Sequence, residues 1–215
     1  MLPPDLQRRI TETDVVIYQI RRGTPPSVRY EIFSRINTGS DEGKEFRAAV
    51  CEGVSPERMG DQECVLRFLA FTFSPPEHYR TRDFDMFLNN AMEVGNRLSE
   101  QKLGEYAKLF RRTMEVAHKV FGDKAFRKMK LGANRRSQVN KALFEAVSVN
   151  ISRLNHEQQE VLITRRSRVI ESMTKLMAND KDFDSSISDG TSSWKKVRYR
   201  FSAVQNLFER VLNVD

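Results

Sequence analysis

Two arginines flank a short turn at which the chain is expected to change direction between two helices. Arg35 lies near the end of a predicted helix over residues 28–36, and Arg47 lies near the start of a second helix. Asn37 and Gly39 stand between them, and both residue types tolerate the left-handed conformation that ends helices. The two cations can converge on one corner, where backbone N–H groups at a helix start also attract anions. An ordinary helix–turn–helix corner with solvated arginines has the same pattern. This alternative stays open because no glycine-rich phosphate-binding fingerprint accompanies the two arginines.

The residues of this corner resemble a motif of one prokaryotic family. The matching strings are FSRINTG at residues 33–39 and KEFRAA at residues 44–49. They are similar to the F-x-R-[IL]-N-[TS]-G and Q-E-[IL]-R-N-A patterns of domain of unknown function 262, a family with a ParB/sulfiredoxin-like fold. Lys44 and Ala48 depart from that pattern, which has glutamine and asparagine there. Other segments resemble further parts of the family, in the family's order. Those before the corner are residues 2–6 and 14–20, and those after it are residues 65–70, 87–89, 121–127 and 140–146.

The resemblance implies a role in nucleotide-dependent DNA recognition and restriction in anti-phage defence. It implies a nucleotide pocket lined by Arg35, Asn37, Gly39 and Arg47, with a nucleoside triphosphate and Mg²⁺ as cofactors. Family members carry an upstream Asp-Gly-Gln-Gln-Arg motif linked to nucleotide hydrolysis, and this string does not occur here. We therefore expect the chain to correspond to the C-terminal part of such a protein. We also expect it to be inactive in hydrolysis unless an upstream segment or partner subunit supplies the motif.

Basic side chains gather in three segments of the second half of the chain. The cations predicted to contact DNA are Lys124, Arg127, Lys128, Lys130, Arg135, Arg136, Arg165, Arg166 and Arg168. A third group lies within residues 195–200. Each phosphate that such a cation neutralises adds salt-dependent affinity. No aromatic residues interleave with these cations as they do in single-strand stacking platforms, so we expect sequence-blind contacts to the DNA backbone. The alternative is scattered surface charge without a joint footprint.

Composition favours a polyanion as partner and a cytoplasmic location. Lys and Arg exceed Asp and Glu by 36 to 29, which gives a net charge of +7. A basic balance favours nucleic acid as a partner. No apolar run approaches the roughly 20 residues that span a bilayer, so no membrane segment is expected. Cys51 and Cys64 form no C-x-x-C pair and are expected to be buried free thiols, as in a reducing cytoplasm. No metal-ligand spacing or catalytic constellation is found.

The predicted fold is mainly α, with an α+β remnant at its start. Apolar residues recur at helical spacing from Val28 onward, and residues 14–20 form the only convincing strand. A lone strand is not stable, so an upstream segment or another chain is expected to complete a sheet. We divide the chain into a ParB/sulfiredoxin-like remnant over residues 1–55, which holds the strand and the helix–turn–helix corner, and a helical bundle over residues 56–215.

The helices of the second half are expected to follow one another with short connections. Their predicted ranges are 62–73, 83–98, 100–121, 138–154 and 157–177, and a last helix is capped by Thr191. Ser99 and Gly122 are the expected cap and stop of the third. Residues 180–190 are expected to be a polar turn anchored by Phe183 and Ile187. In the last helix, Trp194 begins an apolar stripe that indicates core packing, or less simply a dimer seam.

Two functions follow from these patterns. The first is the DNA-contacting and nucleotide-contacting part of a restriction protein that lacks its upstream hydrolytic motif. The alternative is a non-catalytic helical module whose basic face binds another protein.

Overall fold

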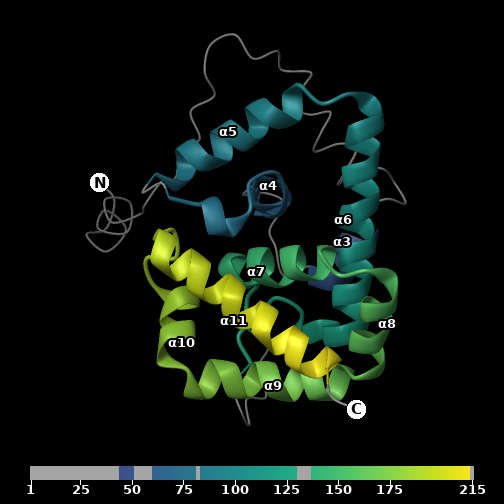
Figure 1. Ribbon diagram of the computed structural model, residues 1–215, viewed down its shortest axis with the longest axis vertical. Helices are drawn as coiled ribbons and strands as arrows, with labels where there is room; N and C mark the ends of the chain where they lie inside the picture. The colour runs from purple at the N-terminus through teal and green to yellow at the C-terminus, as the bar shows by residue number, and fades with distance from the viewer. Residues whose placement is uncertain (1–43, 51–59, 81–82, 130–136, 214–215) are drawn as a thin grey trace, which may run out of the picture.

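The computed structural model describes residues 44–50, 60–80, 83–129 and 137–213, and these residues are mainly α-helical (Figure 1). The helices are α3 (Lys44–Val50), α4 (Gly60–Phe73), α5 (Phe84–Asn96), α6 (Glu100–Phe121), α7 (Lys141–Ser152), α8 (His156–Thr164), α9 (Arg166–Asn179), α10 (Lys181–Ser188) and α11 (Trp194–Leu212), with short 3₁₀ turns η2 (Pro76–His78) and η3 (Gly122–Lys124). The described residues form no strand, apart from one isolated antiparallel bridge between Arg127 and Val139. The prediction of a mainly α fold is confirmed. The predicted strand at 14–20 and helix at 28–36 lie outside the described residues.

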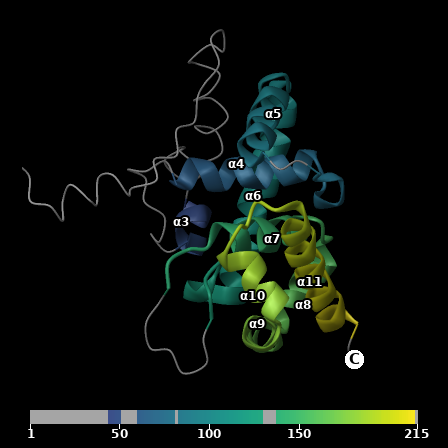
Figure 2. The ribbon, with the colours of Figure 1, turned by 90° about the vertical axis from the view of Figure 1, so that its left-hand side faces the viewer.

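Helix α7 is the centre of the fold. Its residues from Ala142 to Ile151 are all buried, because α4, α6, α10 and α11 pack around it. Figure 2 shows α4 lying across one side of α7, with α10 and α11 on another. Asn140 begins the helix, since its side-chain oxygen accepts from the backbone N–H of Leu143 at 2.9 Å. The Asn140 amide nitrogen also donates to the carbonyl of Ile187 at 2.7 Å, which ties α7 to α10.

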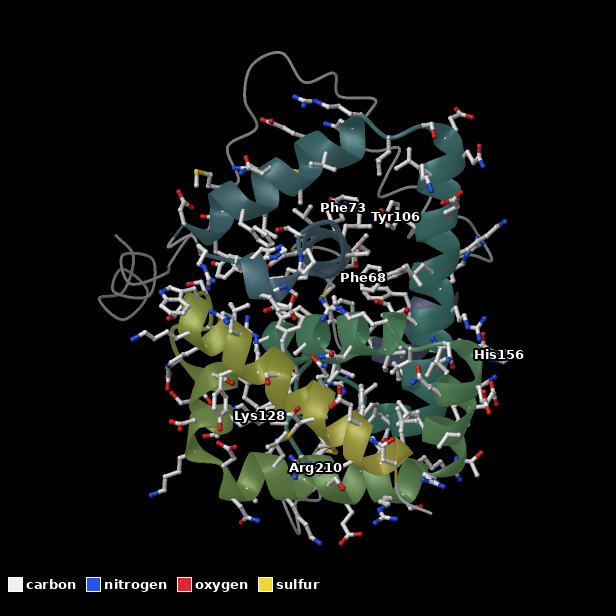
Figure 3. The ribbon with its side chains drawn as sticks, viewed as in Figure 1. Phe68, Phe73, Tyr106, Lys128, His156 and Arg210 are labelled. Carbon is white, nitrogen blue, oxygen red and sulfur yellow. The ribbon has the colours of Figure 1, made fainter. Side chains whose placement is uncertain are left out.

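Aromatic rings fill the space between α4, α5, α6 and α11. Phe71 of α4 lies 4.9 Å from Phe87 of α5 and 4.8 Å from Phe201 of α11, measured between ring centroids. Phe73 meets Tyr106 of α6 edge-on at 5.0 Å, and Figure 3 shows both rings in the interval between α4 and α6. These contacts join helices that are far apart in sequence into one core.

Helix α3 belongs to the same core as the helices that follow it. It starts at Lys44, which agrees with a second helix beginning shortly before Arg47, and its residues Phe46, Ala49 and Val50 are buried. The Phe46 ring lies 5.7 Å from that of Phe110 on α6 and 6.1 Å from that of Phe144 on α7. The packing of residues 44–50 is therefore shared with the helical bundle, while the domain boundary near residue 55 stays a prediction.

The predicted ends of α6 are confirmed, whereas one long predicted helix is wrong. Ser99 accepts from the backbone N–H of Lys102 at 3.3 Å, and Gly122 ends α6 with a φ of 58°. The expected helix over 157–177 is instead two helices, α8 and α9, that break at Arg165. Apolar spacing continues across the break, because Leu162 and Val169 are both buried against the same core, so the periodicity hides it.

Two further predictions of local structure are corrected. Residues 181–188 form helix α10 and not a polar turn, because Asp180 caps it by accepting from the N–H of Phe183 at 2.8 Å. Phe183 and Ile187 are the buried anchors, as expected, and their spacing of one helical turn is what makes α10 amphipathic. The residue before α11 is Ser193 and not Thr191, and its side chain makes no capping hydrogen bond.

Candidate nucleic-acid interface

A charged network inside the bundle uses part of the third basic segment. Glu145 of α7 and Arg200 of α11 are both 0% exposed, and Arg200 Nη2 donates to Glu145 Oε1. Arg200 Nη1 also donates to the carbonyl oxygens of Thr191 at 2.7 Å and Ser186 at 3.3 Å. Arg67 of α4 donates from Nη1 to the other carboxylate oxygen of Glu145 at 2.8 Å. Arg200 is therefore an interior residue that joins α11 to α7, although the sequence places it among surface cations.

The network continues outward along α4. Arg67 Nε donates to Glu63 Oε1 at 2.8 Å, and Lys141 of α7 donates to Glu63 Oε2. Burial disfavours the charged form of Glu63, but the cations of Arg67 and Lys141 outweigh burial and hold the pKa of its carboxyl below the ordinary value. The guanidinium carbon of Arg67 lies 4.4 Å from the centroid of the Phe84 ring. Each of these charged groups has a partner of opposite charge within the network, so the network joins α4, α7 and α11.

Two of the cations predicted to contact DNA make contacts within the protein. Arg127 is only 4% exposed and donates to the carbonyls of Val50 at 2.6 Å and of Ser137, so its guanidinium is used within the protein. It holds the end of α3 against the segment before α7. Lys128 is half-buried and its ammonium group donates to Asp184 of α10 at 3.1 Å. Figure 3 shows Lys128 on the side of the molecule where α10 lies.

Two more cations bind the carbonyl ends of helices. Arg165, predicted to contact DNA, is half-buried, and its Nη1 donates to the carbonyl of Val211 at 2.7 Å and to that of Leu212 at 3.4 Å. Lys196 donates to the carbonyl of Asp189 at 2.6 Å, just beyond the end of α10. The last carbonyls of a helix lack hydrogen-bond donors within the helix and lie at the negative end of its dipole. A cationic side chain both donates to these carbonyls and interacts favourably with the dipole.

The remaining predicted DNA-contacting residues that the structure describes are Lys124, Arg166 and Arg168, and all three are exposed. Lys124 lies in η3, which packs against α3 and α6 and not against α11. Arg166 and Arg168 are close in sequence, but only Arg168 lines the groove between α9 and α11. Outside the described residues lie Lys130, Arg135 and Arg136, together with Arg35, Asn37 and Gly39 of the predicted nucleotide pocket. Arg47 lies on α3, and its side chain is among those not described.

Three cations gather around the ring of Trp194 at the start of α11. Their distances to the ring centroid are 5.8 Å for Arg80, 5.7 Å for Lys195 and 5.9 Å for Arg198. The three cations are exposed, and within the described ranges none of them forms an ion pair. The first turn of α11 holds no acidic residue, although a helix start favours negative charge. The local field here is therefore strongly positive.

Tyr79 fixes the position of Arg80 in this cluster. Its ring is buried against Phe87 at 4.9 Å, and its hydroxyl donates to the carbonyl of Ser192 at 2.8 Å. Burial raises the pKa of the Tyr79 hydroxyl to about 12, so it remains a donor at neutral pH. The hydrogen bond ties the segment after η2 to Ser192, two residues before α11, which brings Arg80 beside Trp194.

A shallow groove of about 720 Å³ lies at the other end of α11, where it meets α9. Its lining residues are Arg168, Ser172, Asn206, Glu209, Arg210, Val211 and Asn213. Figure 3 shows Arg210 between α9 and the last turns of α11. Two guanidinium groups thus reach one groove whose other polar groups are mostly neutral. We call the combined surface the α11 face: Lys195, Arg198 and Arg210 on α11, Arg80 beside its first turn and Arg168 beside its last.

Sequence reasoning missed two members of this surface, and also the exposure of the Trp194 ring beside it. Arg80 and Arg210 are single arginines outside the basic segments, so density of charge along the chain does not reveal them. Trp194 falls in the apolar stripe of α11 and was assigned to the core, but the side chain is only half-buried. The string Trp194-Lys195-Lys196, at a helix start without acidic residues, is a signal that could have indicated a partly exposed tryptophan. A tryptophan that serves only the core has no need of neighbouring cations.

Two searches for other kinds of site give negative results over the described ranges. No group of three or more His, Cys, Asp or Glu residues is placed to hold a metal ion there. No helix among them combines the length and apolar character needed to cross a bilayer. Cys64 is a buried free cysteine as predicted, and burial raises the pKa of its thiol to about 12.

No protein-family model, curated protein or solved structure matches this chain. The resemblance to domain of unknown function 262 therefore stays a prediction that rests on the sequence strings alone.

Proposed function

We propose that the chain binds DNA through the α11 face, as the DNA-contacting part of a nucleotide-dependent recognition protein of prokaryotic defence. The observation that carries the proposal is the group of Arg80, Lys195 and Arg198, which share one small surface without a carboxylate partner in the described residues. Like charges held together in this way repel one another, and a polyanion relieves that repulsion. DNA phosphates are such a polyanion.

The length of the α11 face suits several successive phosphates. About 18 Å of helix axis separates Arg198 from Arg210, at about 1.5 Å per residue. That length corresponds to about five phosphates along one DNA strand, at about 3.4 Å each. The exposed side of α11 carries a single acidic residue, Glu209, which accepts from the side-chain amide of Gln205 at 2.8 Å. The α11 face therefore presents positive charge at both ends of α11, far enough apart to contact phosphates several nucleotides apart.

The proposal is tested by reversing charge on the α11 face and on a matched control face. Lys195→Glu with Arg198→Glu should weaken binding to a labelled DNA duplex in fluorescence anisotropy, and should reduce the salt slope by about 2, since each lost phosphate contact removes about 0.9. The control is Lys102→Glu with Lys119→Glu on α6, which makes the same change in net charge but alters lysines that already pair with Glu105 and Glu115.

The control pair should leave most of the affinity and the salt slope intact. Equal losses in both double variants would mean that only net charge matters, and the α11 face would not be the site. No duplex binding by the parent chain at low salt would overturn the proposal altogether.

The nucleotide-dependent part of the proposal rests on the sequence resemblance. Arg35 and Asn37 would then contact the phosphates of a nucleoside triphosphate, with the hydrolytic motif supplied by an upstream segment or partner subunit. Binding of a fluorescent ATP analogue with Mg²⁺ should be lost in Arg35→Ala, while steady hydrolysis by the chain alone should be negligible. Multiple-turnover hydrolysis that depends on Arg35 would contradict this assignment.

A helical protein-interaction module is the second candidate, and one observation favours it. Met86 and Val94 are 48% and 44% exposed on α5, on the far side of α4 from α7. Exposed apolar side chains on one helix are typical of a docking surface when they are contiguous. This function becomes the better conclusion if the parent chain fails to bind duplex DNA at low salt.

A further inference from the structure

Trp194 differs from the other cation–aromatic contact of the described chain in how its cations are placed. In the interior, the guanidinium carbon of Arg67 stacks closely on Phe84, at 4.4 Å from the ring centroid. Around Trp194, the cationic groups of Arg80, Lys195 and Arg198 stand farther away, at 5.7 to 5.9 Å. All three lie over the indole but farther from it than Arg67 lies from Phe84, and all three are exposed.

The side chain of Trp194 is anchored in the core and partly open to solvent. It packs against the main core cluster while remaining half-buried. Only part of an indole of this kind is needed for packing, and the rest contacts solvent. A large rigid ring in solvent, surrounded by cations, matches the two needs of a single-stranded nucleic acid: a π-face for a base and positive charge for the flanking phosphates.

We infer that Trp194 is a stacking platform for an unpaired base of single-stranded DNA, with Arg80, Lys195 and Arg198 contacting the phosphates on either side of that base. The inference rests on the DNA binding proposed above and adds the substrate class, because the faces of paired bases inside a duplex are not accessible to a side chain. It departs from the expectation that no aromatic residue interleaves with the cations in the manner of a single-strand stacking platform. The consequence is a preference for gaps, overhangs or displaced strands over continuous duplex.

Trp194 is the only tryptophan of the chain, so its fluorescence reports on this site alone. The probes are a short thymidine oligonucleotide, an oligonucleotide of the same length with abasic sugars, and a duplex. Stacking of a base on the indole should quench the emission on addition of the thymidine strand. The abasic strand offers the same phosphates without bases, so it should bind about 5- to 100-fold more weakly and leave the emission nearly unchanged.

Two variants of Trp194 separate stacking from packing. Trp194→Leu keeps an apolar side chain against the core but has no π-face, so the thymidine strand should lose the same 5- to 100-fold and bind no better than the abasic strand. Trp194→Phe keeps a smaller ring and should retain part of the difference. Circular dichroism checks that both variants keep the helical content of the parent. If a variant does not fold, the comparison of the thymidine and abasic strands on the parent still tests the inference.

The outcomes distinguish this inference from the proposed function. If the parent binds the thymidine and abasic strands equally, without quenching, the stacking inference is wrong while DNA binding by the α11 face remains. If the parent binds no nucleic acid at low salt, both fail. Quenching by the thymidine strand that persists in the charge-reversed Lys195 and Arg198 double variant, at higher concentrations, would place the base on Trp194 independently of the phosphate contacts.

Discussion

Arg198 and Arg200 lie two residues apart on α11 and have opposite surroundings. Arg200 points inward, is fully buried, and is held by Glu145 and by backbone carbonyls. Arg198 points outward beside Trp194 and forms no ion pair within the described residues. The comparison teaches that charge along the sequence does not measure charge on the surface. Cations of the interior network hold helices together, whereas those of the α11 face are exposed and can attract a ligand.

The strongest test of the interior network is removal of its central carboxylate. Glu145→Ala leaves Arg67 and Arg200 close together without the charge that separates them, and we expect a loss of about 3–5 kcal/mol in the free energy of unfolding. Urea denaturation followed by circular dichroism measures it. The matched control is Glu209→Ala on the α11 face, where the loss should stay within about 0.5 kcal/mol. Similar losses at both sites would break the comparison.

Arg200 and Arg198 should separate stability from DNA binding. Arg200→Met should lower the free energy of unfolding by about 2–3 kcal/mol, because it leaves buried oxygens of Glu145 and two carbonyls without a donor. Arg198→Met should change stability by less than about 0.5 kcal/mol. In the absence of denaturant, the two variants should have the opposite order of effect on DNA affinity, which should fall in Arg198→Met and stay unchanged in Arg200→Met. Urea titration measures the stability and fluorescence anisotropy measures the DNA affinity of the same samples.

The sequence predicts the helical fold well and the use of each cation poorly, for one physical reason. Helical periodicity is local, and so the ends of α6 and the buried residues of α3 can be inferred from caps and spacing. Whether an arginine faces solvent depends on which helix it meets, and that is a long-range property. Arg127 and Arg165 could not be assigned, because their carbonyl partners lie on segments far along the chain. The break between α8 and α9 is hidden for a different reason, because the apolar spacing continues across it.

Acid should weaken the outer part of the network through Glu63. The pKa of its carboxyl is held below the ordinary 4.5, so its stabilising effect is complete above that value and is lost as the pH falls through the lowered pKa. At neutral pH, Glu63→Gln should cost about 1–2 kcal/mol. The difference in Tm between parent and variant should shrink at pH values below 4.5. A difference that grows in acid would contradict the assigned pairing.

The smallest expected effect concerns the hydrogen bond between the interior and the α11 face. Tyr79→Phe removes the donor to the carbonyl of Ser192 and should cost about 0.5–1.5 kcal/mol. It should also change the emission of Trp194, because Arg80 is then less firmly held beside the ring. Tyr199→Phe is the control, since the exposed hydroxyl of Tyr199 donates to Asp180 at 2.8 Å and its loss should be nearly neutral. Unchanged emission in Tyr79→Phe would show that Arg80 is positioned by other contacts.

The burial of α7 on every side has a consequence for how the chain tolerates changes in length. Each residue added to a helix turns all later side chains by about 100° around its axis. On a helix with one exposed face, that rotation moves some polar residues inward and some apolar ones outward. Residues 142–151 have no exposed face to receive them, and Glu145 and Asn150 would lose partners on α4 and α11 at once. Single-residue insertions and deletions should therefore be least tolerated in α7, and the register of this helix fixes the relative positions of the helices around it.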